Sequence, residues 1–248
     1  FLWGMQGNYF DADLNVTIDN AITREAMQYY ADLLQYAPPD AAGWAFTDQV
    51  ESFMAGRAAM LFYWHGLDLI RRGNPAMLDK IGVVQFPKGK IRVTEQGGRY
   101  ISVFGGSEHV EACKAWVEYI FRPENAMDLT HIQPMLYPPA TYGELELAKQ
   151  SKEAAFADYG DLLLNVVYPS AEFAYNQIFH AGGISTEYDA PQETWILNPL
   201  VSVVWNSNLY ARAVQRVAYE GVPVEQAVAD LQRDLSEQVE VAKAELGL

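Results

Sequence analysis

Trp64, His65 and Gly66 stand together directly after an apolar run, residues 58–63, and they are the first residues of this chain to suggest chemistry. An indole ring stacks well on the C–H face of a pyranose, and an imidazole can hydrogen-bond to sugar hydroxyls. The run is too short for a typical helix and is rich in aromatic residues near its end, so it predicts a buried strand. Ligands of open α/β sheets bind outside the carboxyl ends of strands, so this strand end is the first candidate for a ligand site.

Other aromatic residues also lie beside glycine or polar residues. They are found in Trp3-Gly4, Gly43-Trp44, Gly97-Gly98-Arg99-Tyr100 and Trp205-Asn206. Most Trp side chains belong to cores or half-buried surfaces, so each position alone is weak evidence. The Gly pair alone most often marks a turn, but its place before an expected strand leaves room for a ligand to approach the backbone. The group as a whole favours a carbohydrate ligand.

Patterns typical of metal sites are weak. The four histidines, His65, His109, His131 and His180, are far apart, and no CxxC is present, which disfavours a transition-metal site. Residues 11–19 alternate as in a calcium loop. However, Val16 stands where that loop needs Gly, and Ile22 where it needs Glu, so a polar turn is favoured.

Patterns typical of covalent catalysis are also weak. The chain has no GxSxG sequence and no GxxxxGK[ST] phosphate loop. Cys113 lies on the expected buried stripe of a helix, where a thiol is usually inert packing. Carboxylate pairs for glycoside chemistry converge in space rather than in sequence, so a glycoside hydrolase or lyase using loop carboxylates stays open as an alternative.

Composition narrows the function classes. The chain has 248 residues, and a net charge of −15 disfavours nucleic acid and anionic membrane surfaces as partners. Half of the residues are hydrophobic, which is enough for a sizeable core. A single cysteine rules out an intrachain disulfide, as in a cytosolic protein or an exported bacterial protein built without disulfides. No apolar stretch is long enough to span a membrane. The start at Phe1 without a signal-peptide pattern predicts a processed, trimmed or internal segment.

Hydrophobic periodicity and capping residues predict more helices than strands. Thr23 and Ser107 are the expected N-caps of two of the helices, and Pro123 opens a further one. The expected helices span residues 23–36, 48–55, 107–121, 145–164, 200–219 and 223–246, and the expected strands span 58–63, 81–86 and 101–104. Short strands separated by helices predict an α/β fold with crossover connections.

Several segments, in order along nearly the whole chain, resemble the carbohydrate-binding group (family 1 type) of the bacterial extracellular solute-binding proteins of ABC importers. Residues 53–60, FMAGRAAM, are similar to the family's "F..G.AAM" segment, and residues 84–89, VQFPKG, to its "P.G" turn. Gly97-Gly98 followed by residues 101–107 is similar to its "GG" crossover. Further matches are the 111–124 segment ending in Arg122-Pro123-Glu124, the opening 7–11 segment, Asn198-Pro199, and residues 221–227, GVPVEQA.

The resemblance implies a type II periplasmic-binding-protein-like α/β fold with two lobes and a sugar held in the cleft between them. It covers the carboxyl-terminal part of such a protein. Residues 1–99 and 143–248 would form the carboxyl-terminal lobe. Residues 100–142 would form the hinge crossover and the remnant of the amino-terminal lobe, the rest of which is absent.

The function that follows is the substrate-binding component of an ABC transporter, which binds a sugar or small oligosaccharide and delivers it to the permease. It implies a monomer without catalysis and without a cofactor. The expected partners are the transmembrane subunits of an ABC permease, and the protein itself is not expected to insert into the membrane. The expected location is periplasmic or extracellular, with a lipid anchor on the full-length protein left open. A periplasmic sugar-sensing module is a further alternative. In this hypothesis Trp64 and Tyr100 stack on sugar rings, and His65, Arg99 and Asn208 bond to hydroxyls. Gly97 and Gly98 let backbone amides approach, and Trp205 and Trp44 are wall residues of second rank.

Overall fold

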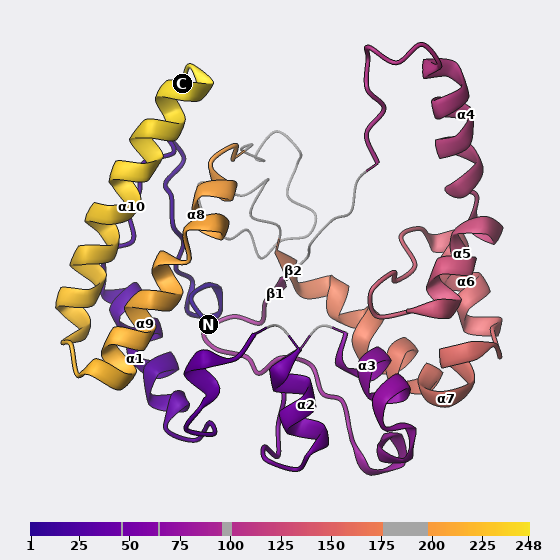
Figure 1. Ribbon diagram of the computed structural model, residues 1–248, viewed down its shortest axis with the longest axis horizontal. Coiled ribbons are helices and arrows are strands. Elements are labelled where there is room, and N and C mark those ends of the chain that lie inside the picture. Colours follow the sequence, from indigo (N-terminus) through magenta and orange to yellow (C-terminus); the bar gives the residue numbers. More distant parts are fainter. Residues whose placement is uncertain (46, 64, 96–100, 176–197) are drawn as a thin grey trace. The chain divides into compact units, whose positions relative to one another are not determined.

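The computed structural model describes residues 1–45, 47–63, 65–95, 101–175 and 198–248. These residues are mainly helical (Figure 1). The helices are α1 (Ala21–Leu34), α2 (Asp48–Met54), α3 (Gly66–Gly73), α4 (Val110–Ile120), α5 (Pro123–Ile132), α6 (Tyr142–Gln150), α7 (Ala154–Leu162), α8 (Val201–Ser207), α9 (Leu209–Glu220) and α10 (Val224–Leu246). Short 3-10 helices span Trp3–Met5, Ala41–Gly43, Pro75–Lys80 and Tyr168–Phe173, and a π-helix spans Leu163–Val167.

Two compact units divide the chain. Unit 1 comprises Phe1–Gly43, Phe86–Gln96 and Glu172–Leu248, and unit 2 comprises Trp44–Gln85 and Gly97–Ala171. Each unit has its own hydrophobic core, so each is described separately. The assignment of residues 1–99 and 143–248 to one lobe, and of 100–142 to a crossover, stays a prediction.

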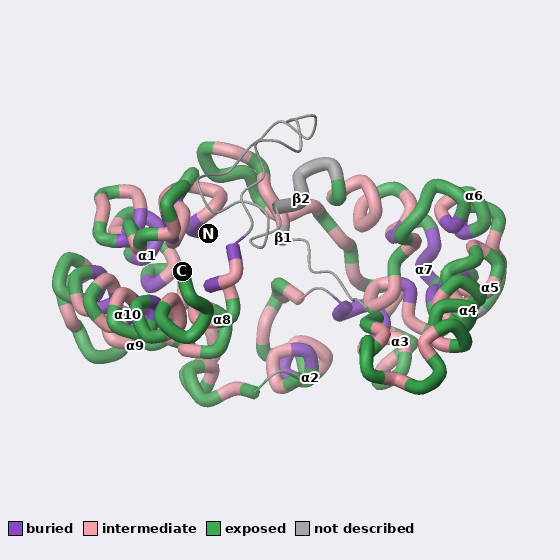
Figure 2. The backbone as a smooth tube through the Cα atoms, turned by 90° about the horizontal axis from the view of Figure 1, so that it is seen from above, coloured by how far each residue is buried: buried purple, intermediate pink, exposed green. Residues whose placement is uncertain are grey.

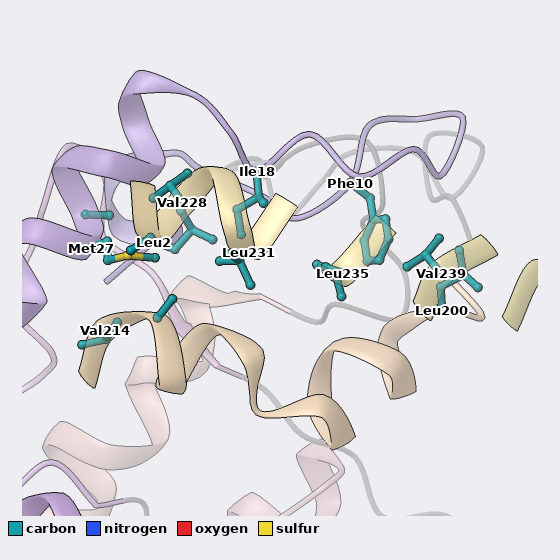
Figure 3. Close-up of a cluster of buried hydrophobic side chains, with 13 residues drawn as sticks. Leu2, Phe10, Ile18, Met27, Leu200, Val214, Val228, Leu231, Leu235 and Val239 are labelled. Atoms are coloured by element: carbon teal, nitrogen blue, oxygen red, sulfur yellow. The ribbon is translucent and has the colours of Figure 1, made fainter. Parts of the chain in front are cut away.

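Unit 1 is built around α1, α9 and α10. Val228, Leu231, Leu235 and Val239, on one face of α10, are buried, and Figure 3 shows them among the labelled core side chains of this unit. The helix ends where Gly247 takes a left-handed φ of 71°, as the C-terminal glycine of a helix commonly does. Helix α1 begins two residues before the expected start, because Asn20 and not Thr23 is the N-cap. The Asn20 side chain accepts a hydrogen bond from the Thr23 N–H at 3.0 Å.

Sheet structure in the described part of unit 1 is short. Strand β1 (Thr94–Glu95) pairs in parallel with β2 (Ala174–Tyr175), with Thr94 opposite Ala174.

The strands expected at residues 58–63, 81–86 and 101–104 are absent, so those predictions were wrong and the α/β class is not confirmed. Several of the side chains expected to be buried there are exposed: Met60, Phe62, Val84, Ile101 and Phe104. An apolar run forms a strand only where a neighbouring strand satisfies its backbone hydrogen bonds.

Unit 2 has its core where α3, α5, α6 and α7 meet, around Leu67, Met127, Phe156, Tyr159 and Leu163. The helix expected over residues 145–164 is two helices, α6 and α7, because residues 151–153 leave the helical conformation. Helix α6 starts earlier than expected, because Thr141 is its N-cap and Glu144 also binds the backbone just before it. The Thr141 hydroxyl accepts from the Glu144 N–H at 3.2 Å, and the Glu144 carboxylate accepts from the Ala140 N–H at 2.6 Å.

Helix α4 forms close to where the sequence predicts it, but its apolar face is not covered within the described residues. None of its side chains is buried, and Figure 2 shows no buried segment along it. Cys113 is half-buried, so the expectation of a buried thiol was wrong. Ser107 lies outside the helix and accepts from the His109 N–H at 3.1 Å, and His109 takes the N-cap position.

Candidate ligand-binding site

The nine residues proposed as ligand contacts divide into those that the structure describes and those that it does not. Trp64, Gly97, Gly98, Arg99 and Tyr100 lie outside the described residues, so their roles stay predictions. The other four are His65 and Trp44 in unit 2, and Trp205 and Asn208 in unit 1.

His65 is the N-cap residue of α3 and Gly66 is its first residue, so these two residues begin a helix and do not end a strand. The helix starts here because Leu67 and Ile70 recur at helical spacing and bury their side chains, while Asp68 places a negative charge in the first turn. The His65 side chain is 8% exposed, and its ring lies 4.6 Å from the ring of Tyr63, measured between centroids. The imidazole is therefore held firmly at the start of α3.

Trp44 is half-buried, ahead of α2. The Arg57 guanidinium carbon lies 5.7 Å from the centroid of its ring, which is within cation–π range. One face of the indole therefore has a cation over it.

Trp205 and Asn208 lie at the end of α8 and just beyond it. The Trp205 side chain is 63% exposed, which leaves its ring open to a ligand. Asn208 is exposed and has a left-handed φ of 55°, a conformation that Asn tolerates better than most residues. This residue divides the helix expected over residues 200–219 into α8 and α9. The Ser207 hydroxyl assists by accepting from the Leu209 N–H at 3.3 Å.

A buried carboxylate, which the sequence analysis missed, lies one turn after His65. Asp68 is 3% exposed and accepts hydrogen bonds from the Tyr159 hydroxyl and, at 3.2 Å, from the Met135 N–H. Burial raises the pKa of Asp68 above its ordinary value, although these hydrogen bonds and the nearby Arg72 act in the opposite direction. Burial, with the Asp68 hydrogen bond and charge, raises the pKa of Tyr159 as well. The sequence signal was an Asp between Leu67 and Leu69, but its partners are 67 and 91 positions away.

One serine–histidine pair in unit 2 invites comparison with nucleophilic catalysis. The Ser151 Oγ lies 2.9 Å from His131 Nε2, and Glu153 Oε2 lies 4.0 Å from His131 Nδ1. A working triad needs the base held by the acid through a hydrogen bond, and 4.0 Å to a carboxylate that is 80% exposed is too loose. Ser151 Oγ also accepts from the Glu153 N–H at 3.3 Å. The pair is therefore a contact between the end of α5 and the α6–α7 connection.

The described residues contain no group of three or more His, Cys, Asp and Glu side chains arranged to hold a metal ion. Within the same residues, no helix is long and apolar enough to cross a membrane. The features that stand out are instead an exposed indole, an exposed amide and an imidazole fixed at a helix start. An indole can stack on a sugar ring, and an amide or imidazole can hydrogen-bond to hydroxyls.

The family comparison names that class. The chain belongs to the bacterial extracellular solute-binding protein family, whose model matches residues 1–127, half of the chain. Comparison with curated proteins gave no significant match. The resemblance noted in the sequence is thereby confirmed at the level of the family.

Membership of this family implies a periplasmic-binding-protein-like fold and a substrate-binding role in ABC transport. It also implies an ABC permease as partner and a periplasmic or extracellular place of action.

Proposed function

We propose that this protein captures a sugar or small oligosaccharide and delivers it to the permease of an ABC importer. The family match over residues 1–127 carries the solute-binding part of this proposal. The choice of a sugar is supported by aromatic residues set beside polar ones, of which Trp205 with Asn208 is the described example. A ring face and an amide three residues apart complement the C–H face and the hydroxyl rim of a pyranose.

Isothermal titration calorimetry of the full-length protein against a panel of mono- and oligosaccharides and polyols tests the proposal. We expect saturable heat and a raised unfolding midpoint with at least one sugar, because a ligand that binds only the folded state stabilises it. No heat and no midpoint shift with any compound would overturn the sugar assignment. Release of product from chromogenic glycosides would instead favour a glycoside hydrolase.

Trp64→Ala is expected to weaken binding of that sugar by more than tenfold, because it removes a stacking ring. The matched control is Trp116→Ala, since Trp116 is an exposed tryptophan on α4 that has no part in the proposed site. Titration of both variants beside the wild type decides the point. Equal affinities for Trp64→Ala and the wild type would remove Trp64 from the site.

Asn208→Gly is a sharper probe of the polar contact, because glycine keeps the left-handed backbone at φ 55° and removes only the amide. Loss of one hydrogen bond to a hydroxyl is expected to weaken binding about two- to tenfold. Ser202→Ala, at an exposed position earlier on α8, is the control and should leave affinity unchanged. Equal effects of the two substitutions would contradict the assigned role of Asn208.

A further inference from the structure

Asp68 is buried more deeply than a carboxylate normally is, and the proposed ligand contacts do not use it. It lies in the first turn of α3 at 3% exposure. One carboxylate oxygen, Oδ1, accepts from the Tyr159 hydroxyl of α7, and the other, Oδ2, accepts from the Met135 N–H of the α5–α6 connection at 3.2 Å. Three separate stretches of unit 2 therefore meet at one side chain.

A buried carboxylate is costly unless its oxygens are satisfied, and an apolar side chain of similar size often gives equal or better stability. Its donors also constrain geometry, because a fully bonded carboxylate accepts only donors that reach it from particular directions. Asp68 accordingly fixes where α3 starts relative to α7 and to Met135.

Two further contacts hold the same helix. Leu67 is buried in the core of unit 2, and Arg71 forms an ion pair with Asp158 of α7. Asp68 and Arg71 are three residues apart, so they lie on neighbouring turns of one helix face. The inner contact, from Asp68, is buried, while the outer one, from Arg71, is partly exposed.

The N-cap of this fixed helix is His65, and Trp64 is the residue before it. A change in the first turn of α3 therefore acts directly on the backbone of His65, the described one of these two proposed contacts. Asp68 itself is unavailable to a ligand, because it is buried and both of its oxygens already accept hydrogen bonds.

We propose that Asp68 is a positioning residue of the ligand site. Its carboxylate fixes the first turn of α3 through Tyr159 and Met135, and it thereby sets ligand affinity without touching the ligand. This inference rests on the proposed function, since it assumes that His65, the N-cap of α3, contacts the sugar.

The test compares Asp68→Asn with Asp158→Asn in the full-length protein. The amide that replaces the Asp68 carboxylate can still accept from the Met135 N–H if its NH₂ group turns to the Tyr159 oxygen. The strong hydrogen bond from the Tyr159 hydroxyl to a carboxylate is then replaced by a weaker, reversed one, and the Tyr159 O–H loses its buried acceptor. Asp158→Asn removes only the outer ion pair between the same two helices and is the matched control. Affinity is measured with the sugar that gives the wild type its largest heat, about 20 °C below the unfolding midpoint of each variant, so that unfolding cannot account for a loss.

We expect Asp68→Asn to weaken binding at least tenfold, and Asp158→Asn less than twofold. Hydrogen exchange of the amides of residues 66–70 should accelerate in Asp68→Asn and stay unchanged in Asp158→Asn. If Asp68→Asn does not fold, Tyr159→Phe takes its place, with an expected loss of at least threefold.

Wild-type affinity in a folded Asp68→Asn or Tyr159→Phe variant, or unchanged exchange at 66–70, overturns the positioning role while leaving the proposed function standing. A wild type that binds no sugar overturns the proposed function and with it the ligand role of Asp68.

Discussion

Helices α10 and α4 have the same amphipathic sequence pattern, but their apolar faces lie in opposite environments. On α10 the apolar stripe is fully buried, with Val228 at 0% and Leu235 at 1% exposure. On α4 no side chain is buried, and Trp116 and Tyr119 are 57% and 55% exposed. Periodicity predicted both helices, and both formed.

The difference between these helices lies in their surroundings. Helix α10 packs on α9 and α1, and polar contacts add to the packing. Arg216 of α9 pairs with Asp230 at 3.0 Å, and Gln232 donates to the carbonyl of Val16 at 2.7 Å. Helix α4 has no comparable neighbour among the described residues. An amphipathic pattern thus indicates which face will be buried if a partner is present, and it does not supply the partner.

The largest effect is expected from Leu235→Ala on α10. Leu235 is 1% exposed, so its truncation removes buried surface and leaves a cavity, at a cost of about 2–5 kcal/mol in the free energy of unfolding. Urea denaturation followed by circular dichroism measures it. Leu246→Ala near the end of the same helix, at 55% exposure, should change the free energy by no more than about 0.5 kcal/mol. Similar losses at both positions would contradict the burial assigned to α10.

One carboxylate in each unit shows how folding can shift a pKa in opposite directions. Asp68 of unit 2 has its pKa raised from 3.8 by burial, so the folded state binds this proton more tightly than the unfolded state does. The stability that Asp68 contributes is therefore present below pH 3.8, and it is lost as the pH rises from 3.8 through the raised pKa of the folded state. Asp230 of unit 1 has its pKa lowered from 3.8, mainly by the hydrogen bond from Arg216. Its contribution is present above 3.8 and is lost as pH falls through the interval below that value.

Unfolding free energies of wild type, Asp68→Asn and Asp230→Asn between about pH 2.5 and pH 7 test this contrast. Acidification from neutral pH should stabilise the wild type relative to Asp68→Asn, and acidification below pH 3.8 should destabilise it relative to Asp230→Asn. The slope difference for Asp68→Asn is limited to about 1.4 kcal/mol per pH unit, the value for one whole proton, and for Asp230→Asn only the sign is predicted. Slopes of the same sign for both variants would contradict the assignments.

An element was predicted well where the residues that determine its bounds lie next to it in the sequence. Helix α10 begins within one residue of its predicted start and ends at the predicted Leu246, because Pro223 and Gly247 are adjacent to its two ends. The break between α8 and α9 was missed, because it depends on Asn208 adopting a left-handed φ without a glycine. The three strands were predicted from apolar runs alone, and a run carries no information about the neighbour that a strand requires.

The same difference between adjacent and distant residues explains which parts of the candidate site were predicted. Trp64, His65 and Trp205 were singled out because residue type and immediate neighbours suffice to suggest a sugar contact. The network around Asp68 was not predicted, since its donors Tyr159 and Met135 come from distant parts of the chain. Membership of the family was predictable because short motifs recur in order, and their order does not depend on knowing any contact.

The smallest effect is expected from Trp116→Ala on α4. The ring is 57% exposed, so truncation removes little packing, and alanine has the higher helix propensity. The unfolding free energy should stay within about 0.5 kcal/mol of the wild type. Phe156→Ala in the core of the same unit, at 6% exposure, is the comparison and should cost about 3–5 kcal/mol. A loss above about 1.5 kcal/mol for Trp116→Ala would mean that the α4 face is covered in solution. The contrast between α4 and α10 would then be wrong, because the apolar faces of both helices would be buried.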